Sequence, residues 1–360
     1  MGKIFSVFNH KGGVGKTTLV HNVGVAMAQS GKNVLFVDAD PQMNLTAAYF
    51  GLSDSVDYAV SDSNSMNANQ NEWVETIEPN LSISEAITAS MSASSPPNSN
   101  FSRRSEGEGS VSILRGAVEL ATLEVDMSLS IATKSNIQAS QVLRVQEFFN
   151  NLSEQYDCVI IDTPPSAGSA ITAVLVRLSH YLITPVSPSF FSLQAIDNLK
   201  PIFQAWNQQF SWISGFSDRV QFLGTVVQMA KRYTGGSNQT GFSAATMEWV
   251  KTLNSRARPF QQWMMGIGRS ISEEDFIRIF PDRTPFVAEI CCDFTPQLRG
   301  ISERAGVPVI NLTQDLCNKY KPTGAAVDIV SNSQGQYKIS FDKINEQYRD
   351  LAQNLLPLLP

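Results

Sequence analysis

Eight residues near the start of the chain combine glycines, lysines and hydroxyls at a spacing suited to phosphate chemistry. They are Lys11, Gly12, Gly13, Val14, Gly15, Lys16, Thr17 and Thr18. Glycines allow a tight turn whose backbone N–H groups point at phosphate oxygens, and a following helix adds the positive end of its dipole. Lys16 would then reach the β- and γ-phosphates, and Thr17 would offer its hydroxyl to Mg²⁺. The pattern predicts a nucleotide-binding P-loop over residues 12–18; the alternative is a Gly-rich turn without a nucleotide.

The residues on either side of this loop favour the first interpretation. An apolar run at 4–8 precedes the loop and predicts a buried strand, and an amphipathic run at 19–28 follows it and predicts a helix. A phosphate-binding loop requires this order of strand, loop and helix.

Carboxylates close two further apolar runs. Asp162 follows 158–161, and Asp38 and Asp40 follow 33–37. Phosphoryl transfer to water needs a metal ion and a positioned nucleophile, so strand-end carboxylates facing the loop are the candidates. Asp162 would hold Mg²⁺ through a water molecule, and Asp38 or Asp40 would order the attacking water or assist at the metal. Because alternate residues of an extended segment point in opposite directions, the two should differ in role. For each aspartate alone, helix capping is the alternative.

The order of apolar runs predicts the fold class. Strands are expected at 4–8, 33–37, 111–114, 158–161, 181–186 and 222–227, with a short strand or its flank at 308–312. Strands that alternate with helical segments, such as 138–153, imply an α/β fold with a doubly wound, mostly parallel sheet flanked by helices. We expect one elaborated domain over 1–360. Segments 54–76 and 92–109, rich in polar and small residues, are interpreted as surface insertions, the second a candidate for disorder.

The octapeptide, with its early lysine, resembles the deviant Walker A motif of the ParA/MinD family of P-loop ATPases. Segments 37–42 with 44–46, 161–166, 183–188 with 191–193 and, more weakly, 305–309 are also similar to that family. The resemblance implies that Lys11 crosses the interface of an ATP-bound dimer to the partner's phosphates, while Lys16 acts within its own subunit. It implies that Asp40 serves hydrolysis, that Asp38 is the supporting acidic residue and that Asp162 is the Walker B carboxylate. The choice of ATP as nucleotide, with Mg²⁺, rests on this resemblance.

Charge is unevenly distributed along the chain. The net charge is −6, but residues 231–269 contain six basic residues against the single acid Glu248. The six are Lys231, Arg232, Lys251, Arg256, Arg258 and Arg269. Lys and Arg contacts to phosphates give sequence-independent affinity for DNA, so this helical region, about 231–283, is the candidate DNA-binding surface. For each residue, an ordinary solvated helix face is the alternative.

Other features bear on location. The first residues lead into a strand instead of a signal peptide, and no apolar run is long enough to span a membrane. The C-terminal segment from Asn345 is apolar but almost without positive charge, so binding to anionic lipid is disfavoured. The four cysteines lack C-x-x-C spacing, which argues against a metal cluster. We expect a cytoplasmic protein, associated with the nucleoid of a prokaryotic cell.

These observations and the resemblance together predict a ParA-like ATPase. It would form a homodimer on ATP, bind DNA nonspecifically and release it when a ParB-like or other cargo adaptor stimulates hydrolysis, in order to partition a plasmid or chromosome or position a cargo. The alternative is a nucleotide-gated protein-interaction switch without DNA binding. A small-molecule kinase or a metal chaperone is less favoured, because the sequence shows neither an acceptor pocket nor a metal-binding cysteine pair.

Overall fold

The computed structural model describes residues 1–51, 80–94, 101–231, 241–321, 327–329 and 336–360. Within these residues one eight-stranded sheet has the order β3-β4-β2-β5-β1-β6-β7-β8. All neighbouring strands pair in parallel except β3 and β4, which are antiparallel. The strands are β1 (Lys3–Val7), β2 (Asn33–Asp38), β3 (Ser102–Glu106), β4 (Gly109–Leu114), β5 (Cys158–Asp162), β6 (Tyr181–Val186), β7 (Gln221–Ala230) and β8 (Val287–Cys292).

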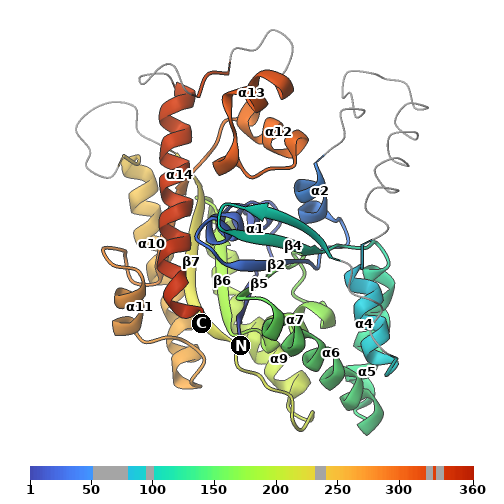
Figure 1. The fold of residues 1–360 in the computed structure, drawn as a ribbon. Coiled ribbons are helices and arrows are strands. Elements are labelled where there is room, and N and C mark those ends of the chain that lie inside the picture. The colour runs from blue at the N-terminus through green and yellow to red at the C-terminus, as the bar shows by residue number, and fades with distance from the viewer. Residues whose placement is uncertain (52–79, 95–100, 232–240, 322–326, 330–335) are drawn as a thin grey trace, which may run out of the picture.

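Helices connect and cover these strands (Figure 1). In the first half they are α1 (Lys16–Gln29), α2 (Asn44–Phe50), α4 (Ile83–Met91), α5 (Leu120–Thr133), α6 (Asn136–Gln155), α7 (Ala170–Leu178), α8 (Phe190–Asp197) and α9 (Leu199–Phe210). In the second half they are α10 (Ala244–Gly266), α11 (Glu273–Ile279), α12 (Pro296–Ala305), α13 (Gln314–Tyr320) and α14 (Gln336–Leu355), with short 3₁₀ helices η1 (Val309–Asn311) and η2 (Leu356–Leu358).

Alternation along β1 separates the two covered faces of the sheet. Phe5 and Val7 pack with side chains of α1 and α14, whereas the Ser6 hydroxyl, between them, donates to the Leu175 carbonyl of α7 at 3.3 Å. Since successive strand side chains point to opposite faces, α1 and α14 lie on one face and α7 on the other. The α/β class and the doubly wound, mostly parallel sheet predicted from the sequence are therefore confirmed.

Three sequence predictions need correction. Residues 102–106, inside the expected insertion at 92–109, form the edge strand β3 and are not disordered. The segment 308–312, expected as a short strand or its flank, contains the 3₁₀ helix η1, where the Ile310 N–H donates to the Asn22 side chain of α1 instead of to a neighbouring strand. Strand β8 was missed. The other expected insertion, 54–76, lies outside the described residues.

Candidate nucleotide-binding site

The loop between β1 and α1 has the backbone of a phosphate cradle. Gly13 and Gly15 adopt left-handed conformations, with φ of 69° and 84°. At Gly15 a Cβ would also lie 3.1 Å from Cγ of Gln228, so this turn requires glycine for conformation and for space. The loop leads directly into the N-terminus of α1, where unpaired N–H groups and the helix dipole favour a bound anion.

The two lysines of the loop point to different places. The Lys16 ammonium is buried and donates to the carbonyl oxygens of Asn9 and Lys11, each at 3.3 Å, so it lies over the loop itself. Burial lowers the pKa of Lys16, and the charges of Asp162 and Asp40 oppose that effect. Lys11 instead extends away from the loop to α8, where its Nζ donates to the Ser189 and Ser192 hydroxyls at 2.8 and 3.2 Å.

Asp162 lies at the end of β5 and faces the start of α1. Its Oδ2 accepts a 2.6 Å hydrogen bond from Thr17 Oγ1, and its Oδ1 is buried without a hydrogen-bond partner among the described residues. Burial, reinforced by the charge of Asp38, raises the pKa of Asp162 to about 8. A divalent cation would favour the charged form and use the unpartnered oxygen. The donor set of one hydroxyl and one carboxylate therefore fits Mg²⁺, which prefers oxygen ligands.

Asp38 is fully buried at the end of β2 and is held by Thr46. Its Oδ2 accepts from the Thr46 backbone N–H at 2.8 Å and from the Thr46 hydroxyl at 2.7 Å. Burial raises the pKa of Asp38 to about 6, although these donors act against it. Gly116 lies against the carboxyl group, because a Cβ there would approach Cγ of Asp38 to 3.0 Å. The room around this carboxylate is therefore fixed by the backbone.

Asp40 is oriented differently from Asp38. Its backbone N–H donates to Asp38 Oδ1 at 3.2 Å, while its own Oδ1 accepts from the Gln42 N–H at 2.9 Å. Asp40 is 8% exposed, whereas Asp38 is fully buried. The two carboxyl groups are thus adjacent but not equivalent: both residues are buried, and only Asp40 retains a small exposed surface.

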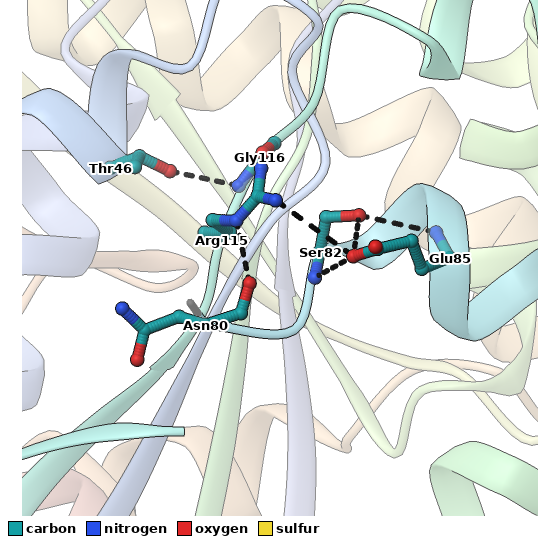
Figure 2. Close-up of polar contacts among 6 residues, drawn as sticks. All are labelled: Thr46, Asn80, Ser82, Glu85, Arg115 and Gly116. Atoms are coloured by element: carbon teal, nitrogen blue, oxygen red, sulfur yellow. Dashed lines mark hydrogen bonds and ion pairs between the residues drawn. The ribbon is translucent and has the colours of Figure 1, made fainter. Parts of the chain in front are cut away.

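The end of β4 and the start of α4 support this arrangement (Figure 2). The Gly116 N–H donates to Thr46 Oγ1 at 2.8 Å, and Arg115 Nε donates to the Asn80 carbonyl at 2.7 Å. Ser82 and Glu85 form a capping box at the N-terminus of α4, and Arg115 forms an ion pair with Glu85 at 3.8 Å. Hydrogen bonds and an ion pair to Arg115 therefore hold the segment 80–85 beside the Asp38 and Thr46 pair.

The P-loop residues and the three aspartates were predicted from the sequence as site residues. In the structure they lie together at the carboxyl ends of β1, β2 and β5. The sequence did not indicate the supporting residues. Thr46 and Ser192 lay in segments noted only for resemblance, and Ser189, Gly116 and Gln228 gave no signal. Hydroxyl and glycine residues are too common in loops for their type alone to mark them.

The candidate DNA-binding residues on and near α10 differ in exposure and in ion pairing. Lys251 and Arg258 are exposed and seven residues apart, so they share one helix face. Arg256 points to α8 and pairs with Asp197 at 2.5 Å, and Arg269 pairs with Asp218. Lys231 is exposed at the end of β7, and Arg232 lies outside the described residues. Among the described residues, three members of the basic cluster therefore form ion pairs within the chain: Lys251 with Glu248, Arg256 with Asp197 and Arg269 with Asp218.

Among the helices that the structure describes, none has the length and apolar character needed to cross a bilayer.

Comparison with known proteins identifies the class. Residues 2–211, more than half of the chain, match the family described as AAA domain (AAA_31). The Bacillus subtilis sporulation initiation inhibitor protein Soj is 28% identical over 199 residues, covering 55% of this chain and 64% of Soj. A ParA family protein of Chlamydia muridarum is 29% identical over 261 residues, covering 71% of this chain and 83% of that protein. The chain belongs to this family and, with these relatives, to the ParA/MinD-type P-loop ATPases.

A solved structure agrees in fold. The ATP complex of a McdA variant from Cyanothece aligns with a TM-score of 0.57 and 15% identity over 98% of this chain and 96% of that one. Soj and two other curated relatives are covered over less than two thirds of their own length.

Proposed function

We propose that this chain is a ParA-like ATPase that forms a homodimer on ATP, binds DNA nonspecifically and releases it when an adaptor stimulates hydrolysis. Its task would be to partition a plasmid or chromosome, or to position another cargo, on the nucleoid of a prokaryotic cell. The adaptor would be a ParB-like or other cargo-bound protein. Relatives that are named as ParA family proteins or as Soj support this class of task.

The separation of the two lysines is the observation that carries the proposal. Lys16 lies over the phosphate-binding loop of its own chain, whereas Lys11 projects away from the loop to a surface that carries exposed Phe190 and Phe191. A long, flexible cation beside the nucleotide site can reach the phosphates of a second copy. An enzyme that binds and hydrolyses the nucleotide as a monomer would not need this second lysine.

Hydrolysis would use the carboxylates at the strand ends. Thr17 and Asp162 would hold Mg²⁺, with Asp38 assisting through water, and the ion would neutralise phosphate charge as the γ-phosphoryl group departs. Asp40 accepts a hydrogen bond at one oxygen and, unlike Asp38, retains a small exposed surface, which supports its role in orienting the attacking water. Thr46 would keep Asp38 in place through its two hydrogen bonds. Without an adaptor we expect slow turnover.

DNA binding would use the exposed face of α10. Lys251 and Arg258 share this face, and the Lys251 contact with Glu248, at 3.6 Å between two well-exposed side chains, costs little to break. Lys231 would add a further phosphate contact. We leave Arg269 out of the proposed interface, because its guanidinium is paired with Asp218 and only 26% exposed.

Binding to a nonspecific DNA duplex, measured with ATP, with ADP and without nucleotide at two salt concentrations, tests this function. We expect binding that requires ATP and weakens steeply with salt, because released counterions drive it. Lys251→Glu with Arg258→Glu should abolish binding for all sequences alike. Lys134→Glu, a charge reversal at the exposed end of α5, is the control for each single variant, Lys251→Glu or Arg258→Glu, and should bind as the parent does.

A second candidate is a nucleotide-gated switch that binds a protein partner without DNA. Two observations support this candidate: Arg256 and Arg269 are engaged in ion pairs, and the net charge is −6. It would replace the first candidate if the exposed basic residues of α10 do not bind DNA. ATP-dependent dimers that bind no DNA under any nucleotide condition would establish this alternative and rule out the first.

A further inference from the structure

The N-terminus of α8 holds the Lys11 ammonium at three points. Lys11 Nζ donates to Ser189 Oγ at 2.8 Å and to Ser192 Oγ at 3.2 Å. The same nitrogen lies 5.7 Å from the centre of the Phe191 ring, which is 67% exposed. Ser189 is the N-cap of α8 and accepts from the Ser192 N–H, so both hydroxyls belong to one capping turn.

This turn is fixed from its other side. The indole Nε1 of Trp249 in α10 donates to the Ser189 carbonyl at 3.3 Å, and Ser192 is fully buried with its Oγ 3.1 Å from Ser187 Oγ. The hydroxyls therefore do not need Lys11 to keep their positions. Together with the Phe191 ring they form a preorganised binding position for the Lys11 ammonium, called the receiving position below.

The receiving position is electrostatically poor for a cation. All three contacts are neutral, and within the described part of the chain no carboxylate lies within ion-pair distance of Lys11 Nζ. The first turn of a helix also carries the positive end of the dipole, which disfavours an ammonium group. Phosphate oxygens would bind Lys11 more strongly, because their hydrogen bonds are charge-assisted. A phosphate anion within reach could therefore draw the Lys11 ammonium away from the two serine hydroxyls.

We propose that Ser189 and Ser192 are positioning residues for Lys11. They hold the lysine against its own subunit until the phosphates of a second copy outcompete them, and so they raise the concentration at which ATP-bound dimers form. The inference rests on the proposed function, since it assigns a resting position to the lysine that would act across the dimer.

The variant Ser189→Gly with Ser192→Ala removes both hydroxyls while sparing the helix, because glycine at an N-cap costs little. Ser135→Gly, at the N-cap of α6, is the matched control. The first readout is the rate at which an amine-acylating reagent modifies Lys11 in the nucleotide-free protein, followed by mass spectrometry. We expect Lys11 to react several-fold faster in the double variant, with Lys134 unchanged, and the Ser135→Gly protein to match the parent.

The second readout is the protein concentration at half-dimerisation with saturating ATP, from sedimentation velocity. We expect it to fall several-fold in the double variant, and we expect Lys11→Ala to stay monomeric with ATP whether or not the two serines are also changed. An unchanged Lys11 acylation rate overturns the inference, and so does a dimerisation effect that persists without Lys11. If acylation rises but the parent protein never dimerises with ATP, the positioning role stands and the proposed function fails.

Discussion

Thr17 Oγ1 donates a 2.6 Å hydrogen bond to Asp162 Oδ2 and so joins the first turn of α1 to the end of β5. The two residues are 145 positions apart, yet parallel pairing of β1 with β5 brings Val7 opposite Asp162 and sets the hydroxyl against the carboxylate. Each of the two side chains offers oxygen to a cation. The relationship places a hydroxyl and a carboxylate together where the proposed Mg²⁺ site would lie.

Replacement of Thr17 or Asp162 should remove the dependence of nucleotide binding on Mg²⁺. For Thr17→Ala and Asp162→Asn we expect hydrolysis to fall by about 10²-fold or more, since electrostatic stabilisation of the transferring group is lost. Titration of Mg²⁺ against a fluorescent nucleotide measures the effect. Thr133→Ala, an exposed hydroxyl at the end of α5, serves as the control. Parental Mg²⁺ dependence in Asp162→Asn would place the metal elsewhere.

The two lysines should separate nucleotide binding from dimerisation. Lys16→Ala should lose nucleotide binding or hydrolysis, because its ammonium lies over the loop. Lys11→Ala should bind nucleotide as a monomer and fail to dimerise. Isothermal titration calorimetry with ATP, paired with sedimentation, distinguishes these outcomes. Equal ATP-dependent dimerisation of Lys11→Ala and the parent would contradict a role across the interface.

Loss of the Asp40 carboxylate should trap the nucleotide-bound dimer. In Asp40→Ala we expect ATP binding and dimer formation to persist while phosphate release falls by about 10²-fold, the range typical of general acid–base groups. Phosphate release under single-turnover conditions measures the chemical step. Asp126→Ala on the exposed face of α5 is the control, and rapid turnover by Asp40→Ala would move the water-positioning role to another group.

Two helix glycines, one packed against the sheet and one with open space around it, should respond oppositely to substitution by alanine. At Gly24 a Cβ would lie 2.1 Å from Cε1 of Phe36, whereas at Gly300 in α12 nothing lies within 4 Å. Gly24→Ala should lower the free energy of unfolding by about 1–3 kcal/mol through overpacking. Gly300→Ala should raise it by up to about 1 kcal/mol through helix propensity. Urea unfolding measures both, and equal midpoints would contradict the close packing of α1.

His21 should make the protein sensitive to acid. It is buried in α1, and burial, with a contribution from the charge of Arg104, lowers its pKa to about 3. Below about pH 6.5 the His21 imidazole becomes protonated in the unfolded chain but stays neutral in the folded one. The free energy of unfolding therefore falls by up to about 1.4 kcal/mol per pH unit until about pH 3. Above pH 6.5 the effect vanishes. His21→Leu should show a shallower loss in urea unfolding between pH 6 and 4, and parallel pH profiles would contradict this.

Much of the fold was accessible from the sequence because central parallel strands are continuous apolar runs. The runs at 33–37 and 158–161 correspond closely to β2 and β5. The edge strand β3 escaped detection because its residues, Ser-Arg-Arg-Ser-Glu, carry no apolar face, and only pairing with β4 makes it a strand. Strand β8 was missed because Glu289 interrupts its apolar residues, and the ion pair with Arg283 is invisible in the sequence.

In the candidate site, too, some residues could be predicted from the sequence and others could not. Residues that contact phosphate or metal must have particular chemistry at short spacing, so the loop and the strand-end aspartates stand out. Their supports are ordinary residues brought together by topology. Ser189 lies 178 positions from Lys11, and no local pattern joins them. Ion pairing of Arg256 and Arg269 was equally hidden, since it depends on where Asp197 and Asp218 fall in space.

The antiparallel strand β3 also limits how copies of this chain can associate. It ends the sheet with five residues, of which Arg103 and Ser105 are exposed. Short, charged outer strands discourage another chain from adding a strand of its own, which is a common route to aggregation. This border of the sheet is therefore unsuited to strand addition, so contacts between copies at this end would use side-chain surfaces instead of backbone hydrogen bonds.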